Sequence, residues 1–235
     1  MRQKACLFIV ACVLILTAYL SLSSGAGPAV LPWPTGLPVY DHVVIVVEEN
    51  KNYDQIIGNT NAPYINNVLK AEGASFTKMF GEEHNSQGNY FWMFSGSNHT
   101  VGFTDVVPTA QNNPNYPFTA SNLGQQLIAK GRSFKGYSES LPSIGFTGNT
   151  SPDSLYARKH VPWISFKNVP NGTTAATSCN LRFADFPTNA AQFKTLPTVS
   201  FVIPNLKNDM HNGDPKDSIP LGDTWLKHNI DAYYQ

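Results

Sequence analysis

Apolar residues in the chain form short, dense runs separated by helical patterns and polar stretches. Two of the runs are rich in β-branched residues and span residues 42–47 ("HVVIVV") and 198–204 ("TVSFVIP"). Uninterrupted runs of this kind are typical of strands that are buried on both faces, as in a parallel sheet. Residues 133–139 ("SFKGYSE") predict a third strand, and residues 75–81 ("SFTKMFG") could form a short one.

Four segments have apolar residues at helical spacing. The first ends at Gly73, a helix stop, and the last begins with Asp223 in its first turn. The four predicted helices cover residues 62–73, 89–96, 122–131 and 223–234. Because strands alternate with helices, we expect an α/β fold with helices on both faces of a sheet. Residues 140–195 are polar, rich in proline and irregular, and we expect a cap or loop region with short helices there.

Polar side chains gather at three places beside these elements. Glu49 and Asn50 come directly after the first apolar run. Ser86 lies just ahead of the aromatic helix, and Asp209 and His211 follow the second apolar run. Sites in open α/β sheets lie at the carboxyl ends of the strands, so the three clusters could meet at one edge of the sheet.

The chemistry of these side chains favours a metal and a nucleophile. A carboxylate beside an amide oxygen is a hard half-site for a divalent metal, and carboxylate with imidazole is a common zinc pair. A serine at a helix N-terminus lies where backbone N–H groups bind phosphate, and a metal or a base can activate its hydroxyl. Together they could transfer a phosphoryl or sulfuryl group through a covalent serine intermediate. Each cluster alone could also be a helix start, an N-cap or a solvated turn.

Composition and charge narrow the class of partner. The sequence has 235 residues, of which 14% are charged, and its formal net charge is zero. These values are typical of a globular domain, and they leave no basic stripe of the kind that binds nucleic acid. We therefore expect no nucleic-acid partner.

The N-terminus predicts export. Residues 1–26 combine Arg2 and Lys4 with a following apolar stretch and small residues up to Ala26, a pattern typical of a signal peptide cleaved after that alanine. A retained anchor is the alternative. We expect a secreted or extracytoplasmic protein, in the periplasm or at the cell surface, with no stable membrane span after cleavage.

The rest of the chain divides into two parts. Residues 27–40 are predicted to form an extended, proline-rich lead-in, and residues 41–235 a single domain.

Five segments resemble, in order, motifs of the bacterial phosphoesterase family. They read "HVVIVVEENKNYDQIIGN", "HNSQGNYFWMFSG", "FKGYSESLP", "YARKHVPWISF" and "LPTVSFVIPNLKNDMHNG…GDTWL". This family includes secreted acid phosphatases, phosphatidylinositol-3-phosphatase-like proteins and relatives of the non-specific phospholipases C. The segments extend from about His42 to Leu226. The resemblance implies an alkaline-phosphatase-like, three-layer α/β/α sandwich and metal-dependent hydrolysis of phosphoric esters.

The resemblance also implies roles for individual residues. Ser86 would be the catalytic nucleophile. The implied ligands of a divalent metal ion, whose identity stays open, are Glu49, Asn50, Ser86, Asp209 and His211. The implied substrate-binding residues are Asn89, Lys159 and His160.

The sequence departs from the family pattern at several positions. Glu48 stands where an apolar residue is usual, and Val161 stands where asparagine is usual. Asn85 and Gly88 replace prolines, which would stiffen the turn at the nucleophile, whereas Gly88 loosens it. Family members continue into a further strand with an acidic metal motif, which is absent up to Gln235. We therefore expect a C-terminally incomplete fold with an unpaired sheet edge.

Three functions are compatible with these residues. The first is an exported, metal-dependent phosphomonoesterase of the acid-phosphatase type. A phospholipase-C-type diesterase is an alternative, and a large apolar mouth on the substrate pocket would favour lipid over soluble monoesters. The third is a catalytically inactive protein that binds phosphate headgroups or glycans. The expected partners are accordingly a small phosphate monoester or a phospholipid headgroup.

Overall fold

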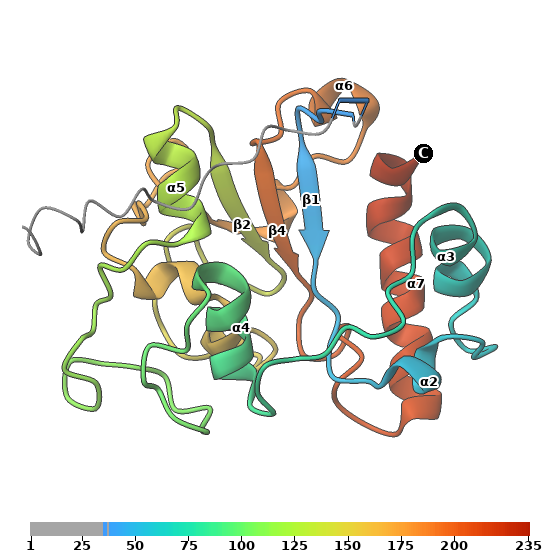
Figure 1. Ribbon diagram of the computed structural model, residues 1–235, viewed down its shortest axis with the longest axis horizontal. Coiled ribbons are helices and arrows are strands. Elements are labelled where there is room, and N and C mark those ends of the chain that lie inside the picture. The colour runs from blue at the N-terminus through green and yellow to red at the C-terminus, as the bar shows by residue number, and fades with distance from the viewer. Residues whose placement is uncertain (1–34, 37) are drawn as a thin grey trace, which may run out of the picture. The chain divides into compact units, whose positions relative to one another are not determined.

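The computed structural model describes residues 35, 36 and 38–235, and Tyr40–Gln235 form one compact unit (Figure 1). The predicted signal peptide and most of the predicted lead-in lie outside the described residues. Within the described part of the chain, no helix has the length and apolar character needed to cross a bilayer.

Four parallel strands form the sheet at the centre of this unit. Their order is β1 (Val43–Val46), β4 (Val199–Ile203), β2 (Phe134–Ser138) and β3 (Asn180–Arg182). The central strands β4 and β2 carry mostly buried residues, as expected where both faces of a parallel sheet are covered. Because all four strands run the same way, their carboxyl ends meet at one edge.

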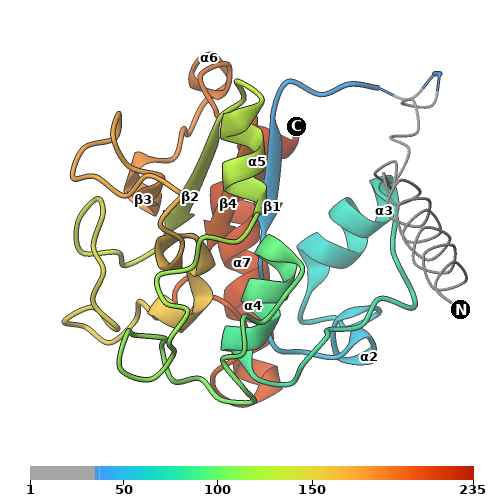
Figure 2. The same ribbon diagram turned by 60° about the vertical axis from the view of Figure 1, so that its left-hand side comes forward.

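One face of the sheet is covered by α4 (Ser86–Ser95) and α5 (Leu123–Ala129), which lie in front of it in Figure 2. The core on this face is largely aromatic. Phe94 of α4 packs on Phe134 of β2 and Phe201 of β4, with ring centroids 5.3 and 6.1 Å apart. This packing fixes α4, and with it Ser86, against the sheet.

The opposite face is covered by α7 (Pro215–Tyr234), behind the sheet in Figure 2. Trp225 and Leu226 of α7 belong to the same buried cluster as Tyr137 and Val202 of the sheet. The remaining helical segments are α2 (Tyr53–Ile56), the π-helix η1 (Ile65–Leu69), α3 (Lys70–Glu72), the 3-10 helices η2 (Arg158–His160), η3 (Pro162–Ser165) and η4 (Phe183–Asp185), and α6 (Ala190–Phe193). The structure thus confirms a mixed α/β fold with a parallel sheet.

The predicted elements are confirmed in most places, with two corrections. Residues 75–81 form no strand, because they lie outside the sheet as an exposed turn. The last helix does not begin at Asp223: Pro215 is its first residue, and the side chain of Asp214 caps it by accepting from Lys216 N. The helix continues past Pro220.

Asp223 has another role inside α7. Its buried carboxylate accepts hydrogen bonds from the backbone N–H groups of Tyr64 and Ile65, at 3.0 and 2.8 Å. It therefore joins the start of η1 to α7, and a buried carboxylate of this kind is satisfied without a metal.

Gly136 of β2 provides a test of the packing on the aromatic face. A Cβ atom at this position would lie 2.1 Å from Trp163 Cζ2, so the indole ring must move if any side chain is added. We expect Gly136→Ala to lower the free energy of unfolding by about 1–3 kcal/mol in urea titrations, because overpacking a dense core is destabilising. Trp163→Phe removes the clashing ring atoms, so the same substitution should cost much less in that background. Equal costs in both backgrounds would contradict the packing described here.

Candidate metal centre

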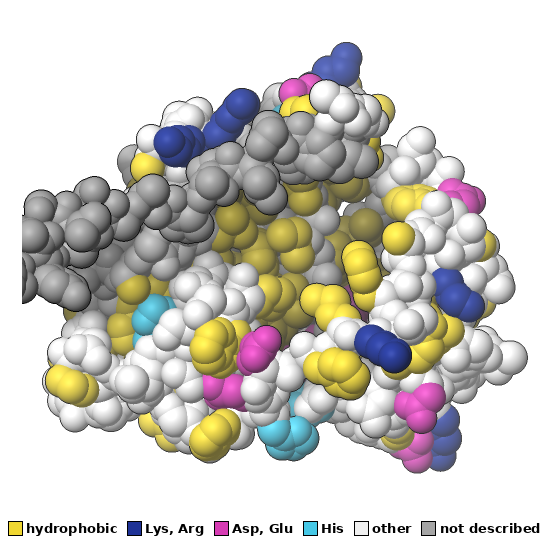
Figure 3. All heavy atoms as spheres, viewed as in Figure 1, with side chains coloured by type: hydrophobic (Ala, Val, Ile, Leu, Met, Phe, Trp, Pro, Cys, Tyr) yellow, Lys and Arg dark blue, Asp and Glu magenta, His cyan; other side chains and the backbone are white. Residues whose placement is uncertain are grey.

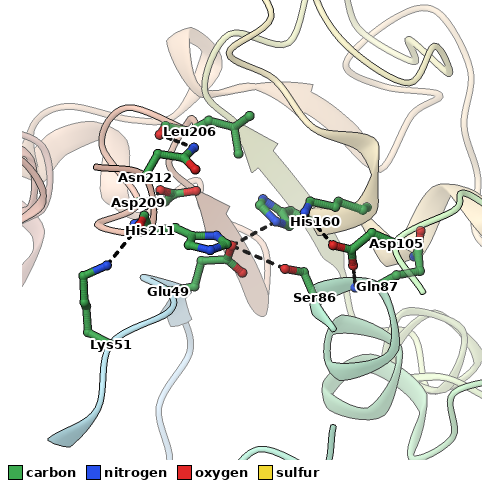
Figure 4. A network of polar contacts seen from close by, with 11 residues as sticks. Glu49, Lys51, Ser86, Gln87, Asp105, His160, Leu206, Asp209, His211 and Asn212 are labelled. Carbon is green, nitrogen blue, oxygen red and sulfur yellow. Dashed lines mark hydrogen bonds and ion pairs between the residues drawn. The ribbon is translucent and has the colours of Figure 1, made fainter. Parts of the chain in front are cut away.

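Polar side chains from four segments converge at the carboxyl edge of the sheet (Figure 4). Glu49 follows β1, and Asp209 and His211 lie in the loop after β4. Ser86 is the first residue of α4, and His160 is the last residue of η2. A backbone hydrogen bond of 2.8 Å from Glu49 N to Asp209 O joins the first two segments. The predicted meeting of the three polar clusters is therefore observed.

One carboxylate oxygen is shared by three side chains. Glu49 Oε1 lies 2.7 Å from His211 Nδ1 and 3.2 Å from His160 Nε2. The hydroxyl of Ser86 donates to the same oxygen at 3.5 Å, the long limit of a hydrogen bond. Glu49 is thus the centre of the site.

The donor atoms of Glu49, His160 and Asp209 lie within 4.8 Å of one another. His160 and Asp209 are each 1% exposed, so their donors face the interior. Asp209 Oδ2 is buried and makes no hydrogen bond to the described residues, while His160 Nε2 lies 3.2 Å from Glu49 Oε1. Buried polar atoms without partners are rare, and two carboxylates with one imidazole suit a zinc-like or manganese-like cation. The donor set therefore fits a divalent metal ion.

The pKa values of the two carboxyl groups diverge. Burial acts to raise the pKa of Glu49, but hydrogen bonds and charge from His160 and His211 outweigh it and lower this pKa to about 2. Burial raises the pKa of Asp209 to about 6; the His211 N–H opposes this shift and the charge of Glu49 reinforces it. Asp209 is therefore the carboxylate with fewer stabilising partners, and a cation would benefit it most.

Ser86 lies where the start of α4 faces the site. It is 7% exposed, and the next residue, Gln87, donates its backbone N–H to Asp105 Oδ1 at 3.1 Å. The positive end of α4 therefore already attracts a carboxylate. Asp105 also forms an ion pair with Lys159 at 2.9 Å.

Asn89 and Gly88 are explained by contacts with Glu83. Asn89 Oδ1 accepts from Glu83 N at 2.8 Å, and its Nδ2 donates to Glu83 O. A Cβ atom at Gly88 would lie 1.9 Å from Glu83 Oε2. A side chain at this position would displace the carboxylate, whose other oxygen accepts from Trp92 Nε1 at 2.8 Å. Glu83 therefore contacts Asn89 and Trp92 on this helix, and its carboxylate occupies the space beside Gly88.

The predicted site residues divide into two groups. Glu49, Ser86, His160, Asp209 and His211 are brought together by the contacts above. Asn50 and Asn89 line the adjoining cavity instead, while Lys159 is held to one side by Asp105. His160 was predicted to bind substrate, and the structure places it among the candidate metal donors.

Two residues of the site were not singled out for a role by sequence analysis. Tyr90 lies one turn after Ser86 and stacks on the His160 ring, with centroids 4.7 Å apart and an interplanar angle of 17°. Its helical spacing from Ser86 is the signal that could have indicated it. Both carboxylate oxygens of Glu48 are buried without a hydrogen-bond partner among the described residues. Burial, followed by the charge of Asp209, raises the pKa of Glu48 well above its usual value.

A cavity of about 630 Å³ opens beside this cluster. Polar residues of its wall include Glu49, Ser86 and Asn89, and its mouth carries the apolar residues Phe76, Met79, Phe80, Tyr53 and Met93. In Figure 3, apolar side chains gather in and around a hollow on this face. A polar floor with an apolar mouth is a common form of ligand site.

Comparison with known proteins identifies the class to which this fold and site belong. A family model described as the Phosphoesterase family matches residues 61–235, which is more than half of the chain. The chain belongs to the Phosphoesterase family.

The chain is similar to three curated relatives. It is 44% identical over 210 residues to a phosphatidylinositol-3-phosphatase of Mycobacterium tuberculosis, covering 89% of this chain and 63% of the relative. It is 31% identical over 188 residues to a probable acid phosphatase of Kluyveromyces lactis, covering 78% and 41%. It is 28% identical over 182 residues to an acid phosphatase of Aspergillus fumigatus, covering 75% and 37%. The chain thus spans less than two thirds of the length of each relative. No solved structure matches it.

The raised pKa of Asp209 predicts how stability depends on pH without metal. Between its ordinary pKa of 3.8 and the folded value of about 6, the folded chain binds more protons than the unfolded one. Stability therefore falls as the pH rises through this window. Asp209→Asn removes the free-energy cost of ionising a buried carboxyl group and keeps an oxygen that accepts from the His211 N–H. At pH about 7.5 it should therefore raise the free energy of unfolding by up to about 3 kcal/mol.

This prediction is checked by urea unfolding in the presence of a chelator. The advantage of Asp209→Asn should disappear below pH about 4, where the wild-type carboxyl is protonated in both states. A destabilised variant at neutral pH would show that the buried carboxylate is already satisfied.

Proposed function

We propose that the chain is a metal-dependent hydrolase of phosphoric esters, of the acid-phosphatase type, with Ser86 as its nucleophile. The observation that carries this proposal is the position of the Ser86 hydroxyl, at the start of α4 and 3.5 Å from a carboxylate of the metal-donor cluster. A nucleophile, a helix N-terminus and a metal-ligating group share one cavity, as phosphoryl transfer requires. The names of the relatives, acid phosphatase and phosphatidylinositol-3-phosphatase, support the same class of substrate.

Ser86 would form the covalent intermediate. Its Oγ attacks the phosphorus atom, and the ester alcohol leaves with the electron pair of the broken P–O bond. The departing alkoxide takes up the proton that Ser86 loses, and Glu49 Oε1, 3.5 Å from Ser86 Oγ, is an acceptor on the path of that proton. Water then hydrolyses the phosphoserine, which releases inorganic phosphate and restores the serine.

Glu49, His160 and Asp209 would hold the divalent ion, with Asn50, Ser86 and His211 beside it as the resemblance implies. The bound ion supplies a Lewis acid that makes a hydroxyl more nucleophilic and offsets charge on the phosphoryl group. The low pKa of Glu49 keeps this ligand ionised throughout the ordinary pH range. Stacking on Tyr90 holds the His160 ring with its Nε2 toward Glu49.

Substrate binding would involve Asn89 and Lys159. Lys159 can reach a phosphate only by leaving Asp105, and because both side chains are partly exposed this ion pair contributes at most about 1 kcal/mol. Moving Lys159 from Asp105 to a phosphate would therefore cost little free energy. Asn89 would require a comparable rearrangement, since its side chain bonds the backbone of Glu83.

The finer assignments of fold and location belong to the same proposal. Helices on both faces of the sheet support the three-layer, alkaline-phosphatase-like sandwich. The sequence pattern of residues 1–26 supports a cleaved signal peptide and export, with residues 27–40 as a lead-in and 41–235 as the phosphoesterase domain.

The apolar mouth of the cavity favours an ester that carries an apolar group, such as a phospholipid with its acyl chains, over a small soluble ester. Phe76, Met79 and Phe80 are 75–83% exposed there. This is the feature that sequence analysis named as the mark of a lipid substrate, and both a monoesterase and a phospholipase-C-type diesterase could use it.

Replacement of Ser86 tests the nucleophile. We expect Ser86→Ala to lower the turnover of an aryl phosphate about a thousandfold or more, because the covalent route is lost. Ser95→Ala is a matched control on the same helix, since the Ser95 hydroxyl bonds only local groups at the far end of α4. Phosphate release in the presence of divalent metal measures both. Substantial turnover by Ser86→Ala would rule out the serine route.

Removal of one donor tests the metal. At a hundredfold excess over Kd, added Zn²⁺ or Mn²⁺ should stabilise the wild-type chain by about 2.7 kcal/mol. Its melting temperature should therefore rise. Glu49→Gln should lose most of this gain, while Asp217→Asn, an exposed carboxylate on α7, should keep it. Calorimetric titration with the ion checks both. A wild-type chain that binds neither ion would contradict the metal assignment.

A further inference from the structure

Three large apolar side chains project from one loop at the mouth of the cavity. Phe76, Met79 and Phe80 are 75%, 80% and 83% exposed, and all three line the cavity that contains Ser86. We call these three residues the apolar loop. Single exposed apolar residues are normal on protein surfaces, whereas a cluster beside a ligand site marks a surface that contacts something.

The loop makes no contribution to the core that would explain its composition. None of its three apolar residues belongs to either buried cluster of the described chain. By contrast, the aromatic residues of α4, which follow closely in the sequence, are mostly buried. The projecting side chains therefore stabilise the isolated domain little, and their exposure costs favourable burial.

The position of the loop indicates the chemistry of its partner. The wall of the same cavity holds Ser86 and Glu49, one of the three candidate metal donors, and the mouth is apolar. A molecule that fits both ends has a phosphate at one end and apolar chains at the other. Such amphiphiles are presented to a protein in an ordered layer, so side chains around the mouth would meet the layer itself.

The charge around the loop indicates how it would hold that layer. Residues 74–85 contain Lys78 between the apolar residues, and Glu82 and Glu83 after them. This segment has no excess of basic residues, so attraction to anionic headgroups is weak. Apolar insertion at the boundary between headgroups and acyl chains is the available source of affinity, with Lys78 able to extend toward the headgroups.

We propose that the apolar loop docks the protein on a lipid surface, with Phe76, Met79 and Phe80 entering the acyl boundary and the cavity mouth facing the headgroups. This inference deepens the proposed function, since it names an ester held in a bilayer as the substrate class. Contact of the apolar loop with lipid can be tested without measuring hydrolysis.

A tryptophan placed in the loop reports the contact locally. The full chain with Phe80→Trp is mixed with phosphatidylcholine vesicles whose acyl chains are brominated near the headgroup, and with unbrominated vesicles. We expect bromine quenching clearly above that of the wild-type tryptophans. Phe103→Trp is the matched control, because Phe103 is 81% exposed and does not line the cavity, and it should add no quenching. Because the probe is local, the comparison with Phe103→Trp separates contact at the loop from binding by other parts of the chain.

Two further variants complete the test. Phe76→Ser with Phe80→Ser, in a chain that carries Met79→Trp, should reduce the added quenching at least about tenfold, since two buried aromatic side chains are lost. Quenching should change less than about twofold between about 0.05 and 0.5 M salt, as apolar insertion is not screened. Added quenching no greater for Phe80→Trp than for Phe103→Trp, or quenching abolished by salt, would overturn the proposal. Ser86→Ala carrying Phe80→Trp should keep its quenching, so failure of catalysis and failure of docking are separate outcomes.

Discussion

The contacts that His160 and His211 make with one oxygen of Glu49 join segments that are far apart in the sequence. Glu49 is mostly buried, and a buried carboxylate is stable only when positive or hydrogen-bonding groups surround it. The loop after β4 and the 3-10 helix η2 stabilise the ionised Glu49 by closing on the end of β1. Ser86, at the start of α4, lies beside the same carboxylate, so one group is shared by the packing of the fold and by the site.

This dependence explains which features the sequence could predict. Strand β4 is a continuous apolar run because both its faces are covered, whereas β1 carries a similar run at the edge of the sheet, where its residues are exposed or only half-buried. Polar residues that follow parallel strands must meet at one edge. Strand β3, with only three residues, has no such signal, and its pairing with β2 depends on tertiary contacts. The start of α7 was missed because Pro220 interrupts its pattern, although Asp214 and Pro215 are a normal N-cap and first residue.

The residues of the candidate site also divide into those that the sequence could predict and those that it could not. Glu49, Asp209 and His211 could be found because they follow strands, and Ser86 because it precedes a helix. The grouping of His160 with the donors could not be found, since η2 lies in the irregular region and the ring contacts Tyr90 and Glu49, which come from other segments. Asp105 comes from a loop without any periodic pattern, and its contact with Gln87 N and Lys159 exists only in three dimensions.

The buried carboxyl groups at this edge of the sheet lower the stability of the fold. Glu48 and Asp209 are both buried with raised pKa values, and each raises the free energy of ionising the other, while Glu49 remains charged between them. A structure selected for stability alone would place apolar residues here, as a buried carboxyl without partners costs several kcal/mol. A cation would stabilise the ionised form of these carboxyl groups, so under the proposed metal assignment binding of a divalent ion and folding of this edge would be one linked equilibrium. Under the same assignment, the unfavourable burial of carboxyl groups at the carboxyl ends of β1 and β4 is the energetic cost of a cation site that forms before the ion binds.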